Sequence, residues 1–339
     1  MFLQRARSAG IQRLKKSLFR ETYAAQNQNS LLLGRIASQQ VRSRERISSL
    51  ADVEFRVSSQ WGEDGILDWL VERANIPGSA QSFIEFGVED YRQSNTRFLL
   101  QNRNWRGLIL DGSPAMLATV KDDGLLWAYD LEARPAFITR ENINELIGAA
   151  NFSGEIGLLS IDLDGNDYWV WEALEVVNPI LLVCEYNAVF GDVYPISTPY
   201  DPAFHRTSAH FSNLYFGASI PALCSLAARK GYRFVGTTTA ANDAFFVRED
   251  YAGRFVDASL ENVLALPSRV RDSRDKHGRP DYVRGLARLS LISEMTVIDV
   301  PTGKSIKLGD LSGIYTKEWL AIMGEGKLDG PATGKRGRL

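Results

Sequence analysis

Short runs of apolar residues, bounded by glycine or polar residues and closed by an acidic residue, dominate the middle of the chain. The clearest runs are 82–87, 107–112, 157–165 and 180–187. Runs of this length without polar alternation are typical of parallel strands that are buried on both faces. Between them, apolar residues recur at helical spacing, as in 63–74. Strands that alternate with helices predict a doubly wound α/β sheet.

Further elements complete this sheet. Residues 125–129 predict another strand, followed by a helix from about 140 to 150. The apolar runs 232–236 and 243–247 predict a terminal antiparallel pair. Together these elements predict a mostly parallel sheet of seven strands. The region 188–217, rich in Pro, Tyr and His, is too long for a plain connection and predicts a lid or substrate loop.

Changes in composition divide the chain into four segments. A hairpin is predicted from Thr296–Val300 to Ser305–Leu308, beyond the α/β region. The segments are a basic helical N-terminal extension at 1–54, the α/β domain at 55–250, a C-terminal appendage with the β-hairpin at 251–325, and a disordered tail at 326–339.

Overall composition is that of an ordinary globular protein. Of the 339 residues, 45% are hydrophobic and 24% are charged, which argues against global disorder. No run approaches the about 20 apolar residues that span a bilayer. The two cysteines, Cys184 and Cys224, are too few for a disulfide framework. A reducing, cytoplasmic environment is therefore expected.

Charge is distributed unevenly along the chain. Residues 1–50 carry ten basic and two acidic side chains, a net charge of +8, and the total of −2 leaves −10 for the remainder. An acidic body argues against a nucleic-acid-binding protein. The basic arm instead suits an anionic membrane surface or an acidic protein partner. The sequence leaves a homo-oligomer open.

Acidic residues stand where the four clearest strands are predicted to end: Glu85, Asp111, Asp162 and Glu185. In open α/β sheets, ligands bind outside the carboxyl ends of the strands, so these carboxylates are expected to gather at one site. A carboxylate at the tip of the second strand is well placed to bind a ribose diol. The pattern favours a nucleotide-type cofactor.

The order of these residues resembles class I S-adenosylmethionine-dependent methyltransferases. Glu85-Phe-Gly87 is followed 24 residues later by Asp111. The resemblance implies that Glu85 and Gly87 let the backbone approach the methionine part of the donor, and that Asp111 binds its ribose hydroxyls. Gly112, directly after Asp111, is grouped with these contacts, although Gly112-Ser113-Pro114 first reads as a tight exit from the strand.

Two motifs resemble the FkbM-like branch of that family: 59–64, Ser-Gln-Trp-Gly-Glu-Asp, and 160–165, Ser-Ile-Asp-Leu-Asp-Gly. The resemblance covers roughly 55–250 and implies methylation of a hydroxyl on a sugar or glycan precursor. One departure concerns the cofactor turn, where the family usually has a second glycine and this chain has Tyr91. A ring there is expected either to crowd the cofactor or to accompany a different turn.

Oxygen ligands also crowd the tips of the fourth and fifth strands, and such ligands suit Mg²⁺. By resemblance to metal-dependent O-methyltransferases, Asp162, Glu185 and Asn187 are the candidate ligands. A metal there would lower the pKa of an acceptor hydroxyl. The alternative is that Asp164-Gly165-Asn166-Asp167 only forms a turn and helix cap.

The candidate catalytic residues are His210, as the base, and Asp162, which would position the acceptor or a metal. His205 is a weaker candidate base. Aromatic residues of the long loop would either stack on a sugar or pack the loop onto the body. Two other functions stay open: a metal-dependent glycosyltransferase that uses Asp162-x-Asp164, and a non-catalytic adaptor in which Tyr91 blocks the cofactor.

Overall fold

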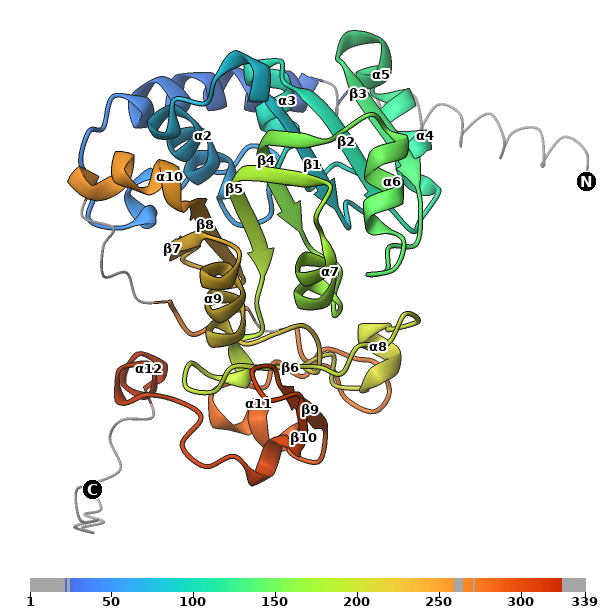
Figure 1. The fold of residues 1–339 in the computed structure, drawn as a ribbon, viewed down its shortest axis with the longest axis vertical. Helices are drawn as coiled ribbons and strands as arrows, with labels where there is room; N and C mark the ends of the chain where they lie inside the picture. Colours follow the sequence, from blue (N-terminus) through green and yellow to red (C-terminus); the bar gives the residue numbers. More distant parts are fainter. Residues whose placement is uncertain (1–21, 23–24, 259–264, 271, 325–339) are drawn as a thin grey trace, which may run out of the picture.

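The computed structural model describes residues 22, 25–258, 265–270 and 272–324. Its main feature is a twisted sheet of seven strands (Figure 1). These strands are β1 (Ser82–Phe86), β2 (Arg106–Asp111), β3 (Leu131–Pro135), β4 (Gly154–Ile161), β5 (Val177–Glu185), β7 (Tyr232–Thr237) and β8 (Asp243–Arg248). The predicted α/β class is confirmed.

The strand order is β3-β2-β1-β4-β5-β8-β7. All neighbouring pairs from β3 to β5 are parallel, whereas β8 is antiparallel to both β5 and β7. The chain therefore starts near the centre, winds to one edge, returns across β4 and ends with the predicted antiparallel pair. The reversal of winding between β1 and β4 opens a crevice at the carboxyl ends, where open α/β sheets bind ligands.

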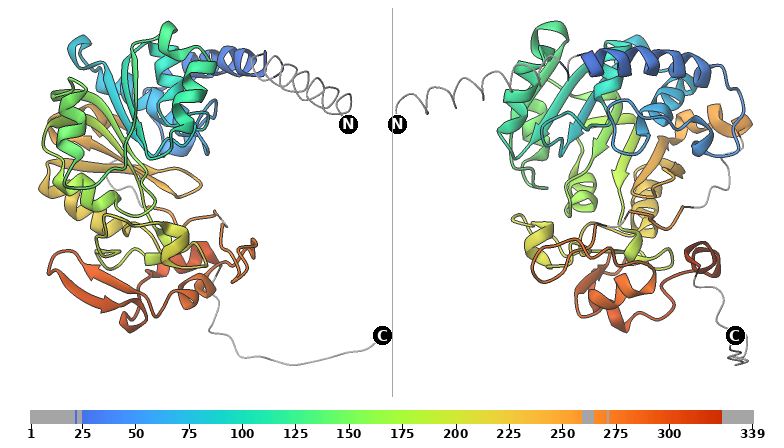
Figure 2. Two further views of the ribbon diagram at one scale, coloured as in Figure 1. Left: turned by 90° about the vertical axis from the view of Figure 1, so that its right-hand side faces the viewer. Right: turned by 180° about the vertical axis from the view of Figure 1, so that it is seen from behind.

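Helices cover both faces of this sheet (Figures 1 and 2). Short 3-10 turns, η1 to η5, lie at Leu50–Val53, Gly78–Ala80, Ala188–Phe190, Gly253–Ala258 and Leu308–Asp310. The helices are α2 (Glu63–Ala74), α3 (Arg97–Arg103), α4 (Ala115–Asp122), α5 (Leu125–Ala128), α6 (Ile143–Ala149), α7 (Asp167–Ala173), α8 (Arg206–Ala209), α9 (Ile220–Arg229), α10 (Glu249–Ala252), α11 (Leu286–Leu291) and α12 (Lys317–Met323).

The strands are apolar throughout because both faces are buried. Side chains alternate between faces along a strand. In β1, Phe83 joins the cluster under α2, α3 and α4, while its neighbour Ile84 joins the cluster under α6, α7 and α9. Both residues have no exposed surface. The result is a three-layer α/β/α body.

The third strand lies elsewhere than the sequence predicted. Residues 125–128 form α5, and β3 follows it at Leu131–Pro135. Leu126 and Trp127 are 41% and 86% exposed, so the apolar run faces outward instead of entering the sheet. β3 pairs only with β2, at the edge, where Pro135 is tolerated. The prediction at 125–129 was wrong because it assumed that an apolar run is buried. The side chains of Leu126 and Trp127 are exposed instead.

A second, smaller sheet joins the long loop to the C-terminal appendage. The predicted hairpin is present as β9 (Thr296–Asp299) and β10 (Lys304–Lys307), and β6 (Ile196–Ser197) of the loop pairs with β9. A separate apolar cluster lies between the two segments and includes Phe190, Ile196 and Val297. The appendage thereby anchors the loop beside the carboxyl ends of the large sheet (Figure 1).

Residues 25–42 form a helix at the end of the body opposite the appendage (Figures 1 and 2). No helix in the described part of the chain is long and apolar enough to cross a bilayer. Most of the basic residues of the predicted arm, and the predicted disordered tail at 326–339, lie outside the described residues.

Candidate active site

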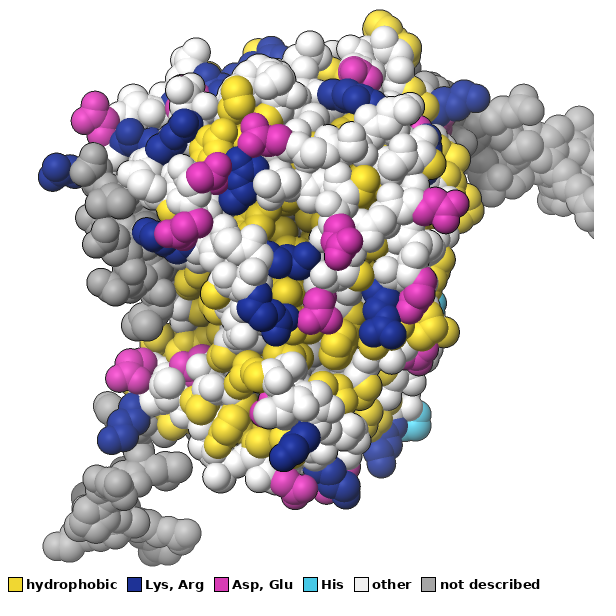
Figure 3. Space-filling view, viewed as in Figure 1, with side chains coloured by type: hydrophobic (Ala, Val, Ile, Leu, Met, Phe, Trp, Pro, Cys, Tyr) yellow, Lys and Arg dark blue, Asp and Glu magenta, His cyan; other side chains and the backbone are white. Residues whose placement is uncertain are grey.

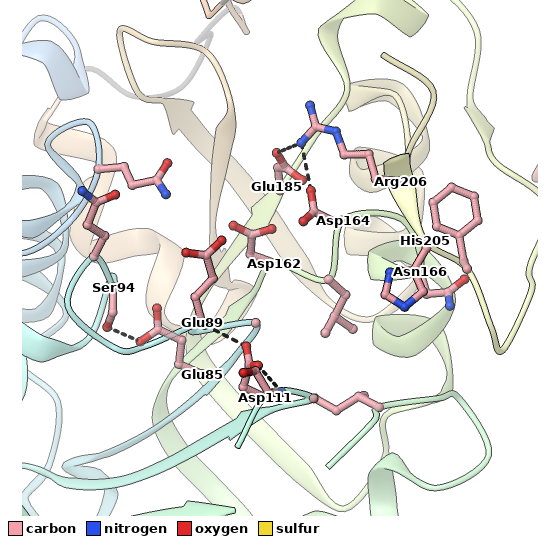
Figure 4. A pocket seen from close by; sticks show the side chains of 18 of the residues that line it. Glu85, Glu89, Ser94, Asp111, Asp162, Asp164, Asn166, Glu185, His205 and Arg206 are labelled. Atoms are coloured by element: carbon pink, nitrogen blue, oxygen red, sulfur yellow. Dashed lines mark hydrogen bonds and ion pairs between the residues drawn. The ribbon is translucent and has the colours of Figure 1, made fainter. Parts of the chain in front are cut away.

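A cavity of about 770 Å³ opens at the carboxyl ends of the parallel strands (Figure 4). Polar and acidic side chains from several strands and from the long loop line it. Six of the residues singled out in the sequence are among them: Glu85, Gly87, Asp111, Gly112, Asp162 and Glu185. Strand tips that are far apart in the sequence thus meet at one site.

Glu85 is buried at the cavity and holds the neighbouring turn by hydrogen bonds. Its carboxylate accepts hydrogen bonds from the Ser94 hydroxyl at 2.8 Å and from the backbone N–H groups of Asn95 and Thr96 at 2.8 and 3.1 Å. Burial raises its pKa, against the effect of these hydrogen bonds. The side chain therefore fixes the turn that carries Ser94 and Asn95 into the cavity wall.

Gly87 is required where β1 leaves the sheet. Its φ is +71°, and a Cβ atom there would lie 1.5 Å from the carbonyl oxygen of Asp162. No side chain fits, because that oxygen belongs to the backbone. The glycine lets the tips of β1 and β4 touch directly under the cavity.

Asp111 is the last residue of β2, which lies beside β1 on the side away from β4. One carboxylate oxygen accepts the Glu89 N–H at 2.7 Å, and the other accepts the Ser113 N–H at 2.6 Å (Figure 4). Since a carboxylate offers about four lone-pair sites, it can still accept two hydroxyl groups. The residues beside it, Gly112 and Phe137, continue the cavity wall, and a Cβ at Gly112 would meet nothing closer than the Phe137 ring at 3.5 Å.

Tyr91 lies away from the cavity. The residue has φ +62°, no exposed surface, and a hydroxyl 3.1 Å from the Thr96 Oγ1. The ring packs in the cluster beneath α2 and α3, with the Arg97 guanidinium 5.9 Å from its centroid. The ring therefore lies in the core and does not form part of the cavity wall.

Three carboxylates converge at the tips of β4 and β5. Ligand oxygens of Asp162, Asp164 and Glu185 lie within 4.8 Å of one another (Figure 4). Burial, with repulsion from Asp164 and Asp167, raises the pKa of Asp162 well above its usual value. Burial and Asp162 do the same to the pKa of Glu185. The cluster therefore holds more negative charge than its surroundings neutralise.

Arg206 of α8 supplies part of the missing positive charge. Its Nη1 lies 2.8 Å from the Asp164 Oδ1 and 3.8 Å from the Glu185 Oε1, and its Nη2 bonds Asp272 (Figure 4). The guanidinium carbon lies 3.6 Å from the centroid of the Phe216 ring. This side chain ties the long loop to the strand tips. The sequence contained no periodicity or motif that pointed to it.

Asn187 is a structural residue, in contrast to its expected role as a metal ligand. Its Nδ2 donates to the carbonyl oxygens of Leu214 and Phe216, both at 2.9 Å. Its Oδ1 accepts the Val189 N–H at 2.9 Å. These bonds hold the loop after β5 and occupy both polar atoms of the Asn187 amide. The third carboxylate of the acidic cluster is that of Asp164.

His210, the candidate base, does not line the main cavity, whereas His205 does. The His210 Nδ1 lies 2.7 Å from the Ser212 Oγ, and its ring lies against Phe211. The sequence placed both histidines in the long loop but gave no register for the loop, so it could not distinguish them. The structure places His205, the weaker candidate, at the wall of the main cavity and His210 outside it.

The turn after β4 contributes both a cap and a cavity wall. The Asp167 carboxylate accepts the N–H groups of Leu163 and Gly165 at 2.7 and 3.0 Å, which is the turn-and-cap role considered in the sequence. Asp164 has φ +53° and points toward Arg206. Asp167 therefore stabilises the turn, and Asp164 belongs to the acidic cluster. The turn-and-cap interpretation applies to Asp167, and the ligand interpretation applies to Asp164.

Two buried acids escaped the sequence analysis. Glu63, at the start of α2, and Asp243, at the start of β8, are 1% and 5% exposed and line the main cavity. Burial raises the pKa of Asp243 well above its usual value. Because β8 is antiparallel, its first residue lies at the same edge as the last residue of β5, and Asp243 is in register with Glu185. Only acids that end strands had been considered.

A smaller cavity of about 260 Å³ adjoins the first. Residues common to both cavities include Asp162, Glu185 and Arg206. Its other walls come from Trp61, from the loop after β5 and from Ser268, Val270 and Asp272. The acidic cluster thus stands at the junction of two spaces.

Comparisons with known proteins give only distant likenesses. No family model and no curated protein matches the chain. Among solved structures, an O-methyltransferase family protein from Burkholderia thailandensis is 14% identical with TM-score 0.33, covering 55% of this chain and 59% of its own. The mitomycin 7-O-methyltransferase MmcR is 13% identical with TM-score 0.32, covering 55% and 56%. An S-adenosylmethionine-dependent methyltransferase from Clostridium acetobutylicum ATCC 824 is 8% identical with TM-score 0.34, covering 56% and 92%.

The chain spans a little over half the length of the first two structures. Similarity at this level concerns the general α/β arrangement and carries no inference about activity or substrate.

Proposed function

We propose that this protein transfers a methyl group from S-adenosylmethionine to a hydroxyl group of a sugar or glycan precursor. The observation that carries the proposal is the position of Asp111. Its carboxylate stands at the tip of β2, in a cavity that continues to the acidic tips of β4 and β5. A ribose diol at Asp111 would direct the rest of a nucleoside along this cavity.

The cavity supports a cationic donor. Acids from five strand tips or loops line it, among them Glu63, Glu85, Asp162, Glu185 and Asp243. S-adenosylmethionine supplies an electrophilic methyl group on a positively charged sulfur. Negative charge at the cavity wall favours the binding of such a cation over that of an anionic nucleotide. The walls near Gly112 and Phe137 would receive the adenine, and those near Ser94 and Asn95 the amino-acid end.

The acidic cluster is the proposed place of acceptor activation. A carboxylate with a raised pKa is a better proton acceptor than an ordinary one near neutral pH. Either Asp162 or Glu185, in its ionised form, would accept the hydroxyl proton, and the other would orient the oxygen toward the methyl group. The new oxygen–carbon bond forms as the sulfur–carbon bond breaks, and the proton remains on the carboxyl group. Most of the rate enhancement would come from alignment.

A divalent cation fits the same cluster. The Glu185 Oε2 is buried and has no hydrogen-bond partner among the described residues. Together with the close ligand oxygens of Asp162 and Asp164, this donor set suits Mg²⁺. A bound metal would lower the pKa of a coordinated hydroxyl group. Arg206 already neutralises part of the cluster, so the metal is proposed as an addition to Arg206.

The smaller cavity is the proposed acceptor site. Its volume of about 260 Å³ is below the range of about 300–1,000 Å³ for pockets that take drug-sized ligands. It therefore suits one sugar ring, with Trp61, which is 44% exposed, available for stacking. Of the five loop aromatics considered in the sequence, Tyr186 lines this smaller cavity, and the other four line neither cavity: Phe190, Tyr194, Tyr200 and Phe211. They mostly pack the loop.

The other functions have less support. A nucleotide sugar brings a diphosphate, and the acids that line the main cavity outnumber its two lining arginines, Arg206 and Arg274. An adaptor needed Tyr91 to block the cofactor, and that ring lies in the core. None of residues 25–46 lines either cavity, so this segment is not proposed to bind the substrate. Because residues 1–50 carry a net charge of +8, the basic N-terminal segment is proposed to bind an anionic surface.

The deciding experiment is calorimetric titration of the full chain with S-adenosylmethionine and S-adenosylhomocysteine, with and without Mg²⁺. Micromolar binding by the wild type is expected. Asp111→Asn should weaken it about 10- to 100-fold, the equivalent of losing charged hydrogen bonds worth about 1.5–3 kcal/mol. Asp130→Asn is the matched control, because Asp130 is 78% exposed and lies outside the cavity.

Absence of binding to the wild type would overturn the proposed donor. Equal affinity in Asp111→Asn and wild type would overturn the assigned donor position. If Mg²⁺ strengthens binding or is bound alone in wild type but not in Asp162→Asn, the metal is supported. If it does neither, the reaction proposed here proceeds with carboxylates and Arg206 alone.

A further inference from the structure

Five exposed large apolar side chains of the described residues lie at one end of the protein. Eleven such residues are exposed among those described, and five of them lie on only two segments. Leu32, Leu33 and Ile36, on helix 25–42, are 58%, 68% and 56% exposed. Leu126 and Trp127, on α5, are 41% and 86% exposed. Exposed apolar patches of this kind mark interaction sites.

The two segments lie side by side at the end of the body that is farthest from the appendage (Figures 1 and 2). Figure 3 shows a hydrophobic tip at the top of the molecule, where Figure 1 places α5. On the rest of this face, basic and acidic side chains are interspersed (Figure 3). We call residues 32, 33, 36, 126 and 127 the apolar end.

Packing of helix 25–42 fixes which side chains face outward. Gly34, Ser38 and Val41 are buried against the body. A Cβ at Gly34 would lie 2.4 Å from the Val57 Cγ2, so the helix backbone is close to its support. Leu32 and Ile36 are one turn apart on the opposite side of the helix. Their exposure thus follows from the docking of the buried stripe, and rotation of the helix would expose that stripe instead.

We propose that the apolar end binds an anionic lipid bilayer. Residues 22–44 contain no acidic residue, and the ten basic residues of 1–50 outnumber the two acids of that segment, Glu21 and Glu45, together with the three that flank α5 at 122, 123 and 130. Clusters of Lys and Arg are attracted to anionic lipid surfaces by about 1 kcal/mol per residue. Leucine and isoleucine enter the acyl boundary, and tryptophan favours the headgroup level.

A bilayer fits better than a protein partner because the apolar end combines few, long aliphatic side chains with excess basic charge in the adjacent sequence. An interfacial helix has this composition. The proposal does not depend on methyl transfer. It has one consequence for the cavity, which opens at the carboxyl ends of the strands, away from this surface (Figure 1). The cavity would therefore face the aqueous side.

The test is sedimentation of the full chain with phosphatidylcholine vesicles, with and without phosphatidylglycerol. The wild type should sediment with the anionic vesicles only, and about 1 M salt should weaken binding because the Debye length falls to about 3 Å. The variant Leu33→Ser, Ile36→Ser, Trp127→Ser should bind about 100-fold more weakly, given the apolar surface removed. Its folding is checked by circular dichroism.

The matched control is Val193→Ser, Tyr282→Ser, Ile322→Ser, which removes three other exposed apolar side chains. It should bind like the wild type. Wild type that stays in solution with anionic vesicles would overturn the proposal, as would equal binding by the first variant. A dimer in analytical ultracentrifugation that the first variant dissociates, without lipid binding, would instead make this end a contact between two copies.

Discussion

Replacing Tyr91 by glycine tests whether the turn after β1 is correctly described. The substitution places a glycine at the position where the resemblance described for the sequence expects one. Tyr91 has no exposed surface, and its hydroxyl lies 3.1 Å from the Thr96 Oγ1. Because the ring packs in the core, its loss should destabilise the protein rather than open the cavity.

The magnitude follows from two opposing terms. Removing a buried aromatic side chain costs about 3–5 kcal/mol. The residue has φ +62°, and glycine relieves a left-handed strain of about 1–2 kcal/mol. The free energy of unfolding should therefore fall by about 1–4 kcal/mol. Tyr91→Phe, which removes only the hydroxyl, should lose about 0.5–1.5 kcal/mol.

Urea unfolding and calorimetric titration with S-adenosylhomocysteine together provide the assay. Stability should fall as calculated, with an affinity that stays within about two-fold of wild type when the protein is folded. An unchanged free energy of unfolding would show that the ring is not a core residue. Tighter binding in Tyr91→Gly would show that the ring crowds the cofactor, and the description of the turn would be wrong.

Three further substitutions test other parts of the structure. Gly87→Ala should cost at least about 2 kcal/mol in urea unfolding and abolish donor binding, since its Cβ would lie 1.5 Å from the Asp162 carbonyl oxygen. Gly231→Ala, with φ +78° and open space around the new Cβ, should cost only about 1–2 kcal/mol, and equal losses would contradict the proposed clash. Burial raises the pKa of Asp64 to about 6, so the folded chain holds this proton more tightly than the unfolded chain. The resulting stability is complete below about pH 4 and is lost as the pH rises through about 6. Between about pH 4 and pH 6, the free energy of unfolding measured in urea should decline less in Asp64→Asn than in wild type. If the free energy falls equally with pH in both proteins, the raised pKa of Asp64 is refuted. His210→Ala should leave the affinity for S-adenosylhomocysteine unchanged, because the His210 ring lies outside the main cavity. A ten-fold loss of affinity would show that His210 does contribute to the donor site.

Local pattern was sufficient for most of the sheet. Buried parallel strands need uninterrupted apolar runs, and their polar ends must lie at one edge, so β1, β2, β4 and β5 could be predicted with their terminal acids. The failure at residues 125–129 has the same origin. An apolar run predicts burial, yet Trp127 is 86% exposed in α5, and nothing within the run distinguishes the two environments.

What the sequence determined by itself is therefore the α/β class and the edge of the sheet at which Glu85, Asp111, Asp162 and Glu185 meet, because both follow from period and strand direction. Tertiary structure alone decided the rest of the site. Arg206 reaches the acids across a loop whose register depends on the β6–β9 pairing. Asp243 joins them because β8 runs antiparallel. Neither contact is local in the chain, so no spacing could encode it.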